Sequence, residues 1–470
     1  MDETHDTRHH EADDPPPRPS DTDSGAKRSH RWWLPTRRRA VVPGVAVLVL
    51  LAGGTGIVLL RDDPTTPHEA AEGTGTAAEA AFAFAECVRD QGVSDYPDPT
   101  IESDGGVFFE GVSRLSAPRE QVRAAQETCR SILDEVRPTD GGGRHEVAPA
   151  AEGWERIVPG GDCRCADGSE YGFHVREADP ERVVLFLDGG GACWSAETCA
   201  PGGDNEYQRT ADGPDGEGVF DFADERNPFA GHSFVFVPYC TADAHLGDAT
   251  TEYTADLTVE HRGAVNAGAA LDHLTETFPD AAEVVVIGAS AGSISAPLYA
   301  GLVSDRLPGA DVMVVADSSG SYSDVPALND ILNGGAWGVG DAFPALPGGL
   351  DPGAGRWSAP GLSVRSGRYD PDIVFARYDH ARDENQAVHL ELAGVDGDDL
   401  LARIDANEAL IEGAGVNVHS YTAPGDGHVV FGNDHFYTEN VGGVALVDWI
   451  TRLHGGEPVD DVRCTDCTEE

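Results

Sequence analysis

Short runs of Val, Ile, Leu and Phe recur along the chain from residue 183 onward and predict the strands of a sheet. They lie at residues 183–187, 234–237, 284–287, 312–316 and 416–422. Continuous apolar runs of this length suit strands that are buried on both faces of a mostly parallel sheet. Between them, residues 261–278 place Leu271, Leu274 and Phe278 on one helical face. The alternation predicts an α/β domain over residues 153–470, with helices on both faces of the sheet.

A smaller unit is expected ahead of this domain, at residues 81–137. AFAFAECVRDQGV and SAPREQVRAAQETCRSIL read as two short helices, with Cys87 in the first and Cys129 in the second. So small a unit has little core of its own, so we expect a disulfide between these two cysteines. Pro-, Thr-, Ala- and Glu-rich residues 61–80 and Gly-rich residues 138–152 are expected to be linkers.

Residues 40–60 form the longest uncharged stretch near the N-terminus. They read AVVPGVAVLVLLAGGTGIVLL, 21 positions without a charge, which as a helix would span about 30 Å, one bilayer core. Arg37, Arg38 and Arg39 precede this run, which predicts a cytoplasmic N-terminal side, with residues 1–39 as a disordered tail. We therefore expect a single-pass membrane protein whose large domain lies outside the cell. A cleaved signal peptide, and hence a secreted protein, is the alternative.

The charge of the chain excludes one class of partner and disfavours another. There are 82 acidic and 32 basic residues, for a formal net charge of -50. Residues 1–39 hold eight of each sign, so the excess acid belongs to the part beyond them. Nucleic acid is not expected as a partner, because binding it takes a basic stripe. A polyanionic substrate such as polygalacturonate would be repelled at low ionic strength.

A serine motif follows the strand at residues 284–287. Residues 288–292 read GASAG, a match to G-x-S-x-G, and a helix-like segment comes next. A strand before and a helix after are the context that a nucleophile elbow requires, and the small neighbours admit its sharp turn. The motif therefore predicts Ser290 as a nucleophile. An ordinary Gly-rich strand–helix turn is the alternative.

A serine hydroxyl needs a base, and in α/β-hydrolases the chain order is Ser, Asp/Glu, His. His428 follows the strand at 416–422 through a short Gly-rich loop and is the predicted base, with His435 as the fallback. His419 lies within that strand, where burial is the simpler interpretation. Asp379 is the predicted orienting carboxylate, since residues 374–378 before it form a plausible strand. On spacing alone, three other residues remain alternatives: Asp370, Asp372 and Asp383.

An oxyanion hole needs backbone N–H groups aimed at the developing negative charge. One is expected from Ala291, directly after the serine. The strand at 183–187 ends in a triple glycine, which lets the backbone approach a substrate closely. Gly190 and Gly191 are therefore the expected second source, although a flexible turn would look the same.

Four blocks in order carry a resemblance to a known family. They are LFLDGGGACWSAETC at 185–199, NPFAGHSFVFVPYCTADAHLG at 227–247, VVVIGASAG at 284–292 and VMVVADSSG at 312–320. Together they resemble the pectin acetylesterase/Notum family of serine carboxylesterases, over about residues 154–467. The resemblance implies an extracellular α/β-hydrolase fold and ester hydrolysis, and by motif position it supports Ser290, Asp379 and His428. The unit at 81–137 also resembles a helical module of actinobacterial exported proteins.

Side chains within these blocks are candidates for the substrate cleft: Trp194, Tyr239 and His245. A structural role for each is an equal alternative. Two departures from relatives bear on the pockets. Asp188 stands where many relatives carry Glu before the glycines, and Ser293 stands where a further Gly is common.

Nine cysteines suit an oxidising compartment, and their odd number leaves one that is unpaired or pairs between chains. Cys193 and Cys199 flank a short loop beside the expected hole and could clip it. Cys240 could meet Cys163 or Cys165, and the pairing of Cys464 and Cys467 stays open. No cofactor or metal is expected, because a zinc site built from these cysteines would lack the histidine spacing.

The sequence thus predicts a membrane-anchored serine carboxylic ester hydrolase, a deacetylase or deacylase, with an ester substrate such as an acetylated glycan. Two alternatives remain. One is a non-catalytic surface binding protein on a hydrolase scaffold, and the other is a thioesterase or peptidase with the same triad. Neither the acyl group nor the alcohol of the substrate follows from the sequence.

Overall fold

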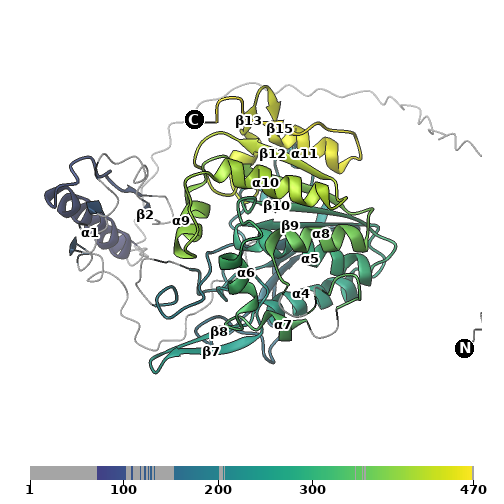
Figure 1. Cartoon of the computed structure of the whole chain (residues 1–470), viewed down its shortest axis with the longest axis horizontal. Coiled ribbons are helices and arrows are strands. Elements are labelled where there is room, and N and C mark those ends of the chain that lie inside the picture. Colours follow the sequence, from purple (N-terminus) through teal and green to yellow (C-terminus); the bar gives the residue numbers. More distant parts are fainter. Residues whose placement is uncertain are drawn as a thin grey trace, which may run out of the picture. The chain divides into compact units, whose positions relative to one another are not determined.

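A computed structural model describes residues 71–101, 107–108, seven positions between 117 and 132, and then 153–200, 205, 207–343, 346–351, 353 and 356–467. The predicted tail, the apolar run at 40–60, residues 61–70 of the first linker and the whole linker at 138–152 lie outside the described residues. Within the described part of the chain, no helix is long and apolar enough to cross a membrane. The N-terminal unit and the large domain are described separately below (Figure 1).

The N-terminal unit contains the helix α1, Ala71–Asp90, so that residues 71–80, expected as linker, are helical. Described positions between 121 and 132 are helical as well. The Cys87–Cys129 disulfide joins the two helical segments. A small core of Phe84, Ala85, Val88, Val93, Tyr96, Val122 and Ala125 surrounds it. The sequence did not predict the short antiparallel pair of β1, Thr100–Ile101, and β2, Val107–Phe108.

A nine-stranded sheet forms the centre of the large domain, in the order β15-β12-β11-β10-β9-β5-β6-β4-β3. All pairs from β6 to β15 are parallel, while β4 and β3 are antiparallel. This confirms the predicted, mostly parallel sheet. The strands are β3 Glu155–Ile157, β4 Phe173–Arg176, β5 Asp179–Leu187, β6 His232–Val237, β9 Glu283–Ala289, β10 Asp311–Asp317, β11 Val374–His380, β12 Val418–Ala423 and β15 Val462–Arg463.

Helices follow the strands. They are α4 Gly263–Thr277, α5 Ala291–Arg306, α6 Pro326–Asn333, α7 Val339–Ala342, α8 Ala359–Tyr369, α9 Glu384–Leu392, α10 Leu400–Gly413 and α11 Leu446–His454. Short 3-10 turns lie at η2 Gly218–Phe220 and η3 Asp434–Tyr437. Two hairpins were not predicted: β7 Ala249–Thr254 with β8 Leu257–His261, and β13 Asn440–Val441 with β14 Val444–Ala445.

The apolar runs of the central strands supply both faces of the sheet. Alternate residues such as Val285 and Ile287 join the core beneath α11, and Val284 and Val286 join the core that contains α4, α5 and α8. This explains why the strands read as continuous apolar runs rather than as alternating ones. In Figure 1, α5 lies beside β9 and β10, and α8 packs against α5.

The parallel arrangement also positions the site. The carboxyl ends of β5, β9, β10, β11 and β12 meet at one edge, which is where open α/β sheets place their ligands. The predicted triple glycine, serine and histidine each follow one of these strands.

Candidate active site

Ser290 lies in the turn between β9 and α5, with a φ of 50° and ψ of -116°. A serine rarely adopts this left-handed conformation, and single strained residues of this kind cluster at functional sites. Both motif glycines are required sterically. A Cβ on Gly288 would lie 2.4 Å from Gly292 O, and one on Gly292 would lie 2.2 Å from Leu187 O. The sequence thus forces a tight turn that presents the serine at the sheet edge.

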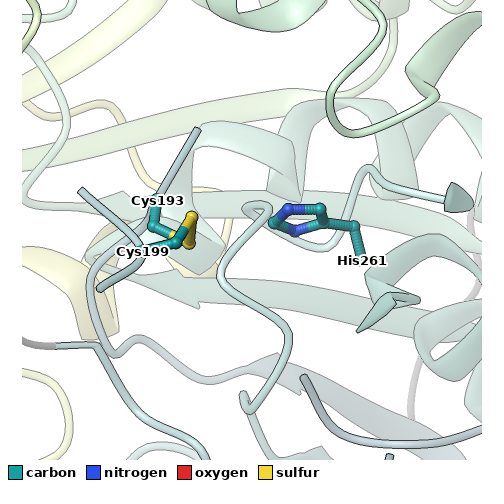
Figure 2. Close-up of side chains that lie close together, drawn as sticks. All are labelled: Cys193, Cys199 and His261. Atoms are coloured by element: carbon teal, nitrogen blue, oxygen red, sulfur yellow. A yellow bond between two sulfur atoms is a disulfide. The ribbon is translucent and has the colours of Figure 1, made fainter. Parts of the chain in front are cut away.

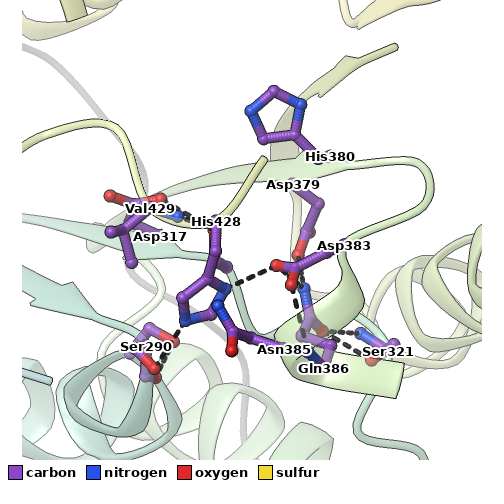
Figure 3. Close-up of polar contacts among 12 residues, drawn as sticks. Ser290, Asp317, Ser321, Asp379, His380, Asp383, Asn385, Gln386, His428 and Val429 are labelled. Carbon is purple, nitrogen blue, oxygen red and sulfur yellow. Dashed lines mark hydrogen bonds and ion pairs between the residues drawn. The ribbon is translucent and has the colours of Figure 1, made fainter. Parts of the chain in front are cut away.

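His428 contacts Ser290, as predicted. Its Nε2 lies 2.8 Å from Ser290 Oγ, and its Nδ1 lies 2.7 Å from Asp383 Oδ2 (Figure 3). The fallback His435 lies exposed in η3. A serine, an imidazole and a buried carboxylate in this chain of contacts have the geometry of a Ser-His-Asp triad.

The structure corrects the expected acid, because the carboxylate at His428 is Asp383 and not Asp379. Asp379 lies within β11, which runs two residues further than the predicted strand. Its Oδ1 accepts hydrogen bonds from Gly320 N at 2.7 Å and from Gln386 Nε2 at 3.2 Å. Its Oδ2 lies 3.1 Å from Arg377 Nε. Asp383 comes after the strand, at the N-cap of α9, and can therefore reach over to His428.

Gln386 connects the two carboxylates. Its Nε2 donates to Asp383 Oδ2 at 3.0 Å as well as to Asp379, and its backbone N donates to Asp383 Oδ1 at 3.0 Å. Its Oε1 accepts from Ser321 N, which fixes the orientation of the amide (Figure 3). Sequence reasoning missed Gln386. The signal was present in residues 383–386, DENQ, because an N-cap Asp followed three residues later by Gln marks a helix start.

The charges around His428 favour its role as a proton acceptor. Burial alone would lower the pKa of His428, but the hydrogen bond and the charge of Asp383 outweigh it and raise that pKa above its ordinary value. Burial raises the pKa of Asp379 to about 6, in spite of nearby Arg377 and the N–H of Gly320. An imidazolium formed at His428 is thus stabilised mainly by Asp383.

The triple glycine passes directly against the serine. A Cβ on Gly189 would lie 2.6 Å from Ser290 Cβ, so only glycine allows this approach. Gly191 and Ala291 line a cavity together with Ser290. Gly190 accepts a hydrogen bond from Gln208 N and packs between Gln208 and Tyr239. Of the three predicted oxyanion residues, Gly191 and Ala291 therefore face the cavity beside the serine.

Two of the three candidates for the substrate cleft are buried supports of this loop. Tyr239 OH accepts a hydrogen bond from Ala244 N, and His245 Nε2 lies 2.9 Å from Asp188 O. Both side chains are 1 % exposed, and burial lowers the pKa of His245 to about 4. The alternative of a structural role is the correct one for Tyr239 and His245. Trp194, in contrast, lines the cavity.

Cys193 and Cys199 form a disulfide that closes the loop after the glycines. Cys193 N donates to Ala242 O at 3.0 Å, and Trp337 Nε1 donates to Cys193 O at 2.7 Å. His261 faces the disulfide (Figure 2), with Nδ1 3.0 Å from Thr241 O and Nε2 2.9 Å from Tyr253 OH. With both sulfurs bonded to each other and both ring nitrogens engaged, this group of side chains is arranged for rigidity and not for metal binding.

The remaining cysteines resolve the pairings that the sequence left open. Cys240 pairs with Cys165, and Cys464 pairs with Cys467. Among the described residues, Cys163 is the one free thiol, and it is partly buried.

Comparison with known proteins places these motifs in one family. The family described as Pectinacetylesterase matches residues 159–330. Palmitoleoyl-protein carboxylesterase notum2 of Xenopus laevis is 33% identical over 93 residues, 18% of this chain and 19% of that protein. Pectin acetylesterase 4 of Arabidopsis thaliana is 27% identical over 169 residues, 34% of this chain and 40% of that protein. An inactive palmitoleoyl-protein carboxylesterase, notum1b of Danio rerio, is 30% identical over 122 residues, 24% of this chain and 82% of that protein.

The chain belongs to the pectin acetylesterase/Notum family. A solved structure of the Wnt deacylase Notum from Drosophila covers 67% of this chain and 97% of its own, with 16% identity and a TM-score of 0.46. The matched segments make up less than half of the Xenopus and Arabidopsis relatives.

The family match includes the serine turn and the triple glycine but ends at residue 330. Asp383, Gln386 and His428 lie beyond it, so their assignment rests on the geometry of this chain. These residues nevertheless contact the matched segment directly, because His428 Nε2 lies 2.8 Å from Oγ of the matched Ser290.

The cavity beside Ser290 is the feature of this family member that sequence reasoning missed most completely. Apart from the serine, its walls are mainly apolar, and residues from α5, α6 and the segments around them contribute: Trp194, Ile294, Leu328, Ile331, Leu332 and Trp337. The carbonyl of an ester held at Ser290 would therefore have an apolar space next to it.

Proposed function

We propose that this member of the family is a serine carboxylic ester hydrolase. The observation that carries the proposal is the unbroken series of contacts from Ser290 Oγ through His428 to the buried Asp383. Membership of a family of carboxylesterases and pectin acetylesterases supports it. The strained backbone of Ser290 and the glycine loop pressed against it support it as well.

The mechanism follows from the positions of these groups. Ser290 Oγ attacks the ester carbonyl while His428 Nε2 takes its proton, and Asp383 stabilises the resulting imidazolium. Backbone N–H groups near Gly191 and Ala291 bind the oxyanion. His428 then returns the proton to the departing alcohol. Water repeats the sequence on the acyl-enzyme, which releases the acid and restores the serine.

The apolar cavity favours an acyl group larger than acetyl. Its lining is mainly apolar, as in many small-molecule pockets, so it suits a hydrocarbon chain better than a small acetyl group. Burying each additional methylene of a substrate chain would contribute about 0.8 kcal/mol. We therefore propose deacylation of a medium or long apolar chain. Removal of acetyl groups from a glycan, as the name of the Arabidopsis relative suggests for that protein, is the second candidate.

A non-catalytic binding protein is the competing proposal, since the relative from Danio rerio is named as inactive. The triad geometry favours the enzyme. An irreversible fluorophosphonate probe distinguishes the two, because it reacts with an activated serine hydroxyl. Full-length protein should be labelled stoichiometrically and the Ser290→Ala variant should not. An unlabelled wild-type protein, beside a labelled control esterase, would favour the binding protein.

The chemistry is tested with p-nitrophenyl esters of acetate, octanoate and palmitate, together with acetylated xylan. We expect kcat/KM to be highest for an ester with a medium or long chain, and Ser290→Ala to lose nearly all turnover. Full turnover in Ser290→Ala would refute the proposal. An amide and a thioester of the preferred acyl group test the peptidase and thioesterase alternatives.

We also propose that residues 40–60 anchor the chain, with residues 1–39 cytoplasmic and the catalytic domain outside the cell. The apolar run, the arginines before it and four disulfides support this arrangement. Protease added to intact cells should remove the domain and leave a membrane-embedded stub. Activity recovered only in the culture medium would instead indicate a cleaved signal peptide.

A further inference from the structure

Residues 314–320, VVADSSG, contain two buried side chains to which the proposed mechanism gives no role, Asp317 and Ser318. Both are fully buried at the carboxyl end of β10. Asp317 Oδ2 accepts hydrogen bonds from Val430 N at 2.8 Å and Phe431 N at 2.9 Å. Ser318 Oγ accepts one from Val429 N at 3.0 Å. The three backbone N–H groups that follow His428 thus all donate to the side chains of Asp317 and Ser318. Figure 3 shows Asp317 beside Val429 and His428.

The held segment is one that would not adopt its conformation unaided. Val429 has a φ of 50°. This left-handed conformation is strained for a β-branched residue and persists only where surrounding contacts impose it. Ser318 itself has a φ of 70°, and its N–H donates to Tyr378 O at 2.8 Å. Residues 429–431, after His428, and Ser318, which binds them, are therefore both fixed in place by hydrogen bonds.

Asp317 also contacts the other reacting residue. Its backbone carbonyl accepts a hydrogen bond from Ser290 N at 2.8 Å. A single residue therefore holds the nucleophile through its backbone and the segment after His428 through its side chain. Asp317, at the end of β10, therefore helps to fix the distance between Ser290 Oγ and His428 Nε2.

We propose that Asp317 is a positioning residue that aligns His428 with Ser290 through hydrogen bonds, and that it does not act as a second orienting carboxylate. The inference rests on the proposed esterase function and deepens it by assigning the VVADSSG block. His428 Nδ1 already has Asp383 as its partner, and the hydrogen bonds of Asp317 go to backbone N–H groups instead.

Asp317→Asn separates hydrogen bonding from charge. Because Val430 and Phe431 donate to the same oxygen, an amide oxygen can keep both bonds. Ser318 Oγ donates to Oδ1 at 3.1 Å in the wild type. In the variant the amide nitrogen takes the place of Oδ1, so this bond reverses and the amide donates to the hydroxyl. Asp317→Asn should retain kcat within about 5-fold. Asp317→Ala should lose kcat about 100-fold with KM nearly unchanged, since displacing a reacting group by about 1 Å can cost that much.

Asp311→Ala is the matched control, since Asp311 is an exposed aspartate at the opposite end of the same strand, and it should leave kcat unchanged. Wild-type turnover and its loss in Ser290→Ala are measured first, so a failure of the esterase proposal is recognised separately. With those established, near-wild-type kcat in Asp317→Ala overturns the positioning role. Equal losses in Asp317→Asn and Asp317→Ala also overturn it, in favour of charge.

If Asp317→Ala does not fold, Ser318→Ala provides the test. It removes the acceptor of Val429 N and the hydrogen bond from Ser318 Oγ to Asp317 Oδ1 but keeps both bonds from Asp317 Oδ2. We expect about a 10-fold loss of kcat in a variant that still folds. Wild-type kcat in a folded Ser318→Ala would then overturn the proposal.

Discussion

Two aspartates four residues apart compete for the role of the triad acid, and changing each to asparagine separates them. In Asp383→Asn an NH2 group replaces one carboxylate oxygen, and in either orientation it meets a hydrogen-bond donor. Oδ2 accepts from Gln386 Nε2 and lies at His428 Nδ1, and Oδ1 accepts from Gln386 N. The imidazolium also loses its neighbouring charge. In Ser-His-Asp enzymes this substitution lowers kcat by about 10⁴-fold, which corresponds to about 5 kcal/mol of transition-state stabilisation.

Asp379→Asn should act on stability and much less on turnover. The amide oxygen can still accept from Gly320 N and Gln386 Nε2, but the buried partner of Arg377 is lost. Removing one member of a buried ion pair costs about 3–5 kcal/mol. Arg377 keeps Glu408 at 2.8 Å, so we expect a loss of about 1–3 kcal/mol. The kcat of this variant should stay within about 10-fold of wild type.

Both variants are assayed for kcat on the preferred p-nitrophenyl ester and for unfolding free energy in urea. Asp372→Asn, an exposed aspartate just before β11, serves as the control for both measurements. The assignment of Asp383 would be refuted if Asp379→Asn lost as much kcat as Asp383→Asn. An Asp383→Asn variant with kcat within 10-fold of wild type would also refute the assignment of Asp383.

Three further measurements test the site. Because Asp383 raises the pKa of His428 and the base must be neutral, kcat/KM should rise with pH to an inflection above the ordinary histidine value, and Asp383→Asn should lower that inflection; an inflection unchanged in the variant would contradict this. Ile294→Trp should fill part of the cavity and lower kcat/KM at least 10-fold for octanoate but little for acetate; equal losses on both esters would show that the cavity does not hold the acyl chain. Replacing Cys193 and Cys199 together by Ser should cost about 2 kcal/mol in urea unfolding and lower kcat by loosening the glycine loop; a variant with wild-type stability and kcat would contradict a bracing role.

The parts of the site that the sequence predicted are those set by local chemistry. The serine turn follows from small residues between a strand and a helix, and the glycine loop follows from a strand that ends in three glycines. His428 follows a strand that lies in the same parallel sheet. Because parallel strands share one carboxyl edge, local patterns far apart in the chain come together without further information.

The acid could not be chosen by the same reasoning. Asp379 and Asp383 flank the end of β11, and the choice depends on where the strand stops and α9 begins, which differs by only a few residues. The cavity was missed for another reason. Its apolar residues on α5 and α6 have the spacing of ordinary core positions, and only the packing of the whole domain leaves space beside them.

The net charge and the cavity constrain opposite ends of the proposed substrate. In the proposed mechanism the cavity beside Ser290 would hold the acyl side of the ester, and its apolar walls favour a chain over an acetyl group. The alcohol side must approach through solvent near a chain of net charge -50, which repels a polyanion at low ionic strength. A neutral or cationic alcohol carrying an apolar acyl chain satisfies both constraints, whereas acetylated polygalacturonate satisfies neither. Raising the ionic strength should therefore speed turnover of acetylated pectin and leave that of neutral p-nitrophenyl octanoate nearly unchanged. A pectin rate that is independent of salt would remove the charge from consideration and leave the cavity as the sole basis for substrate choice.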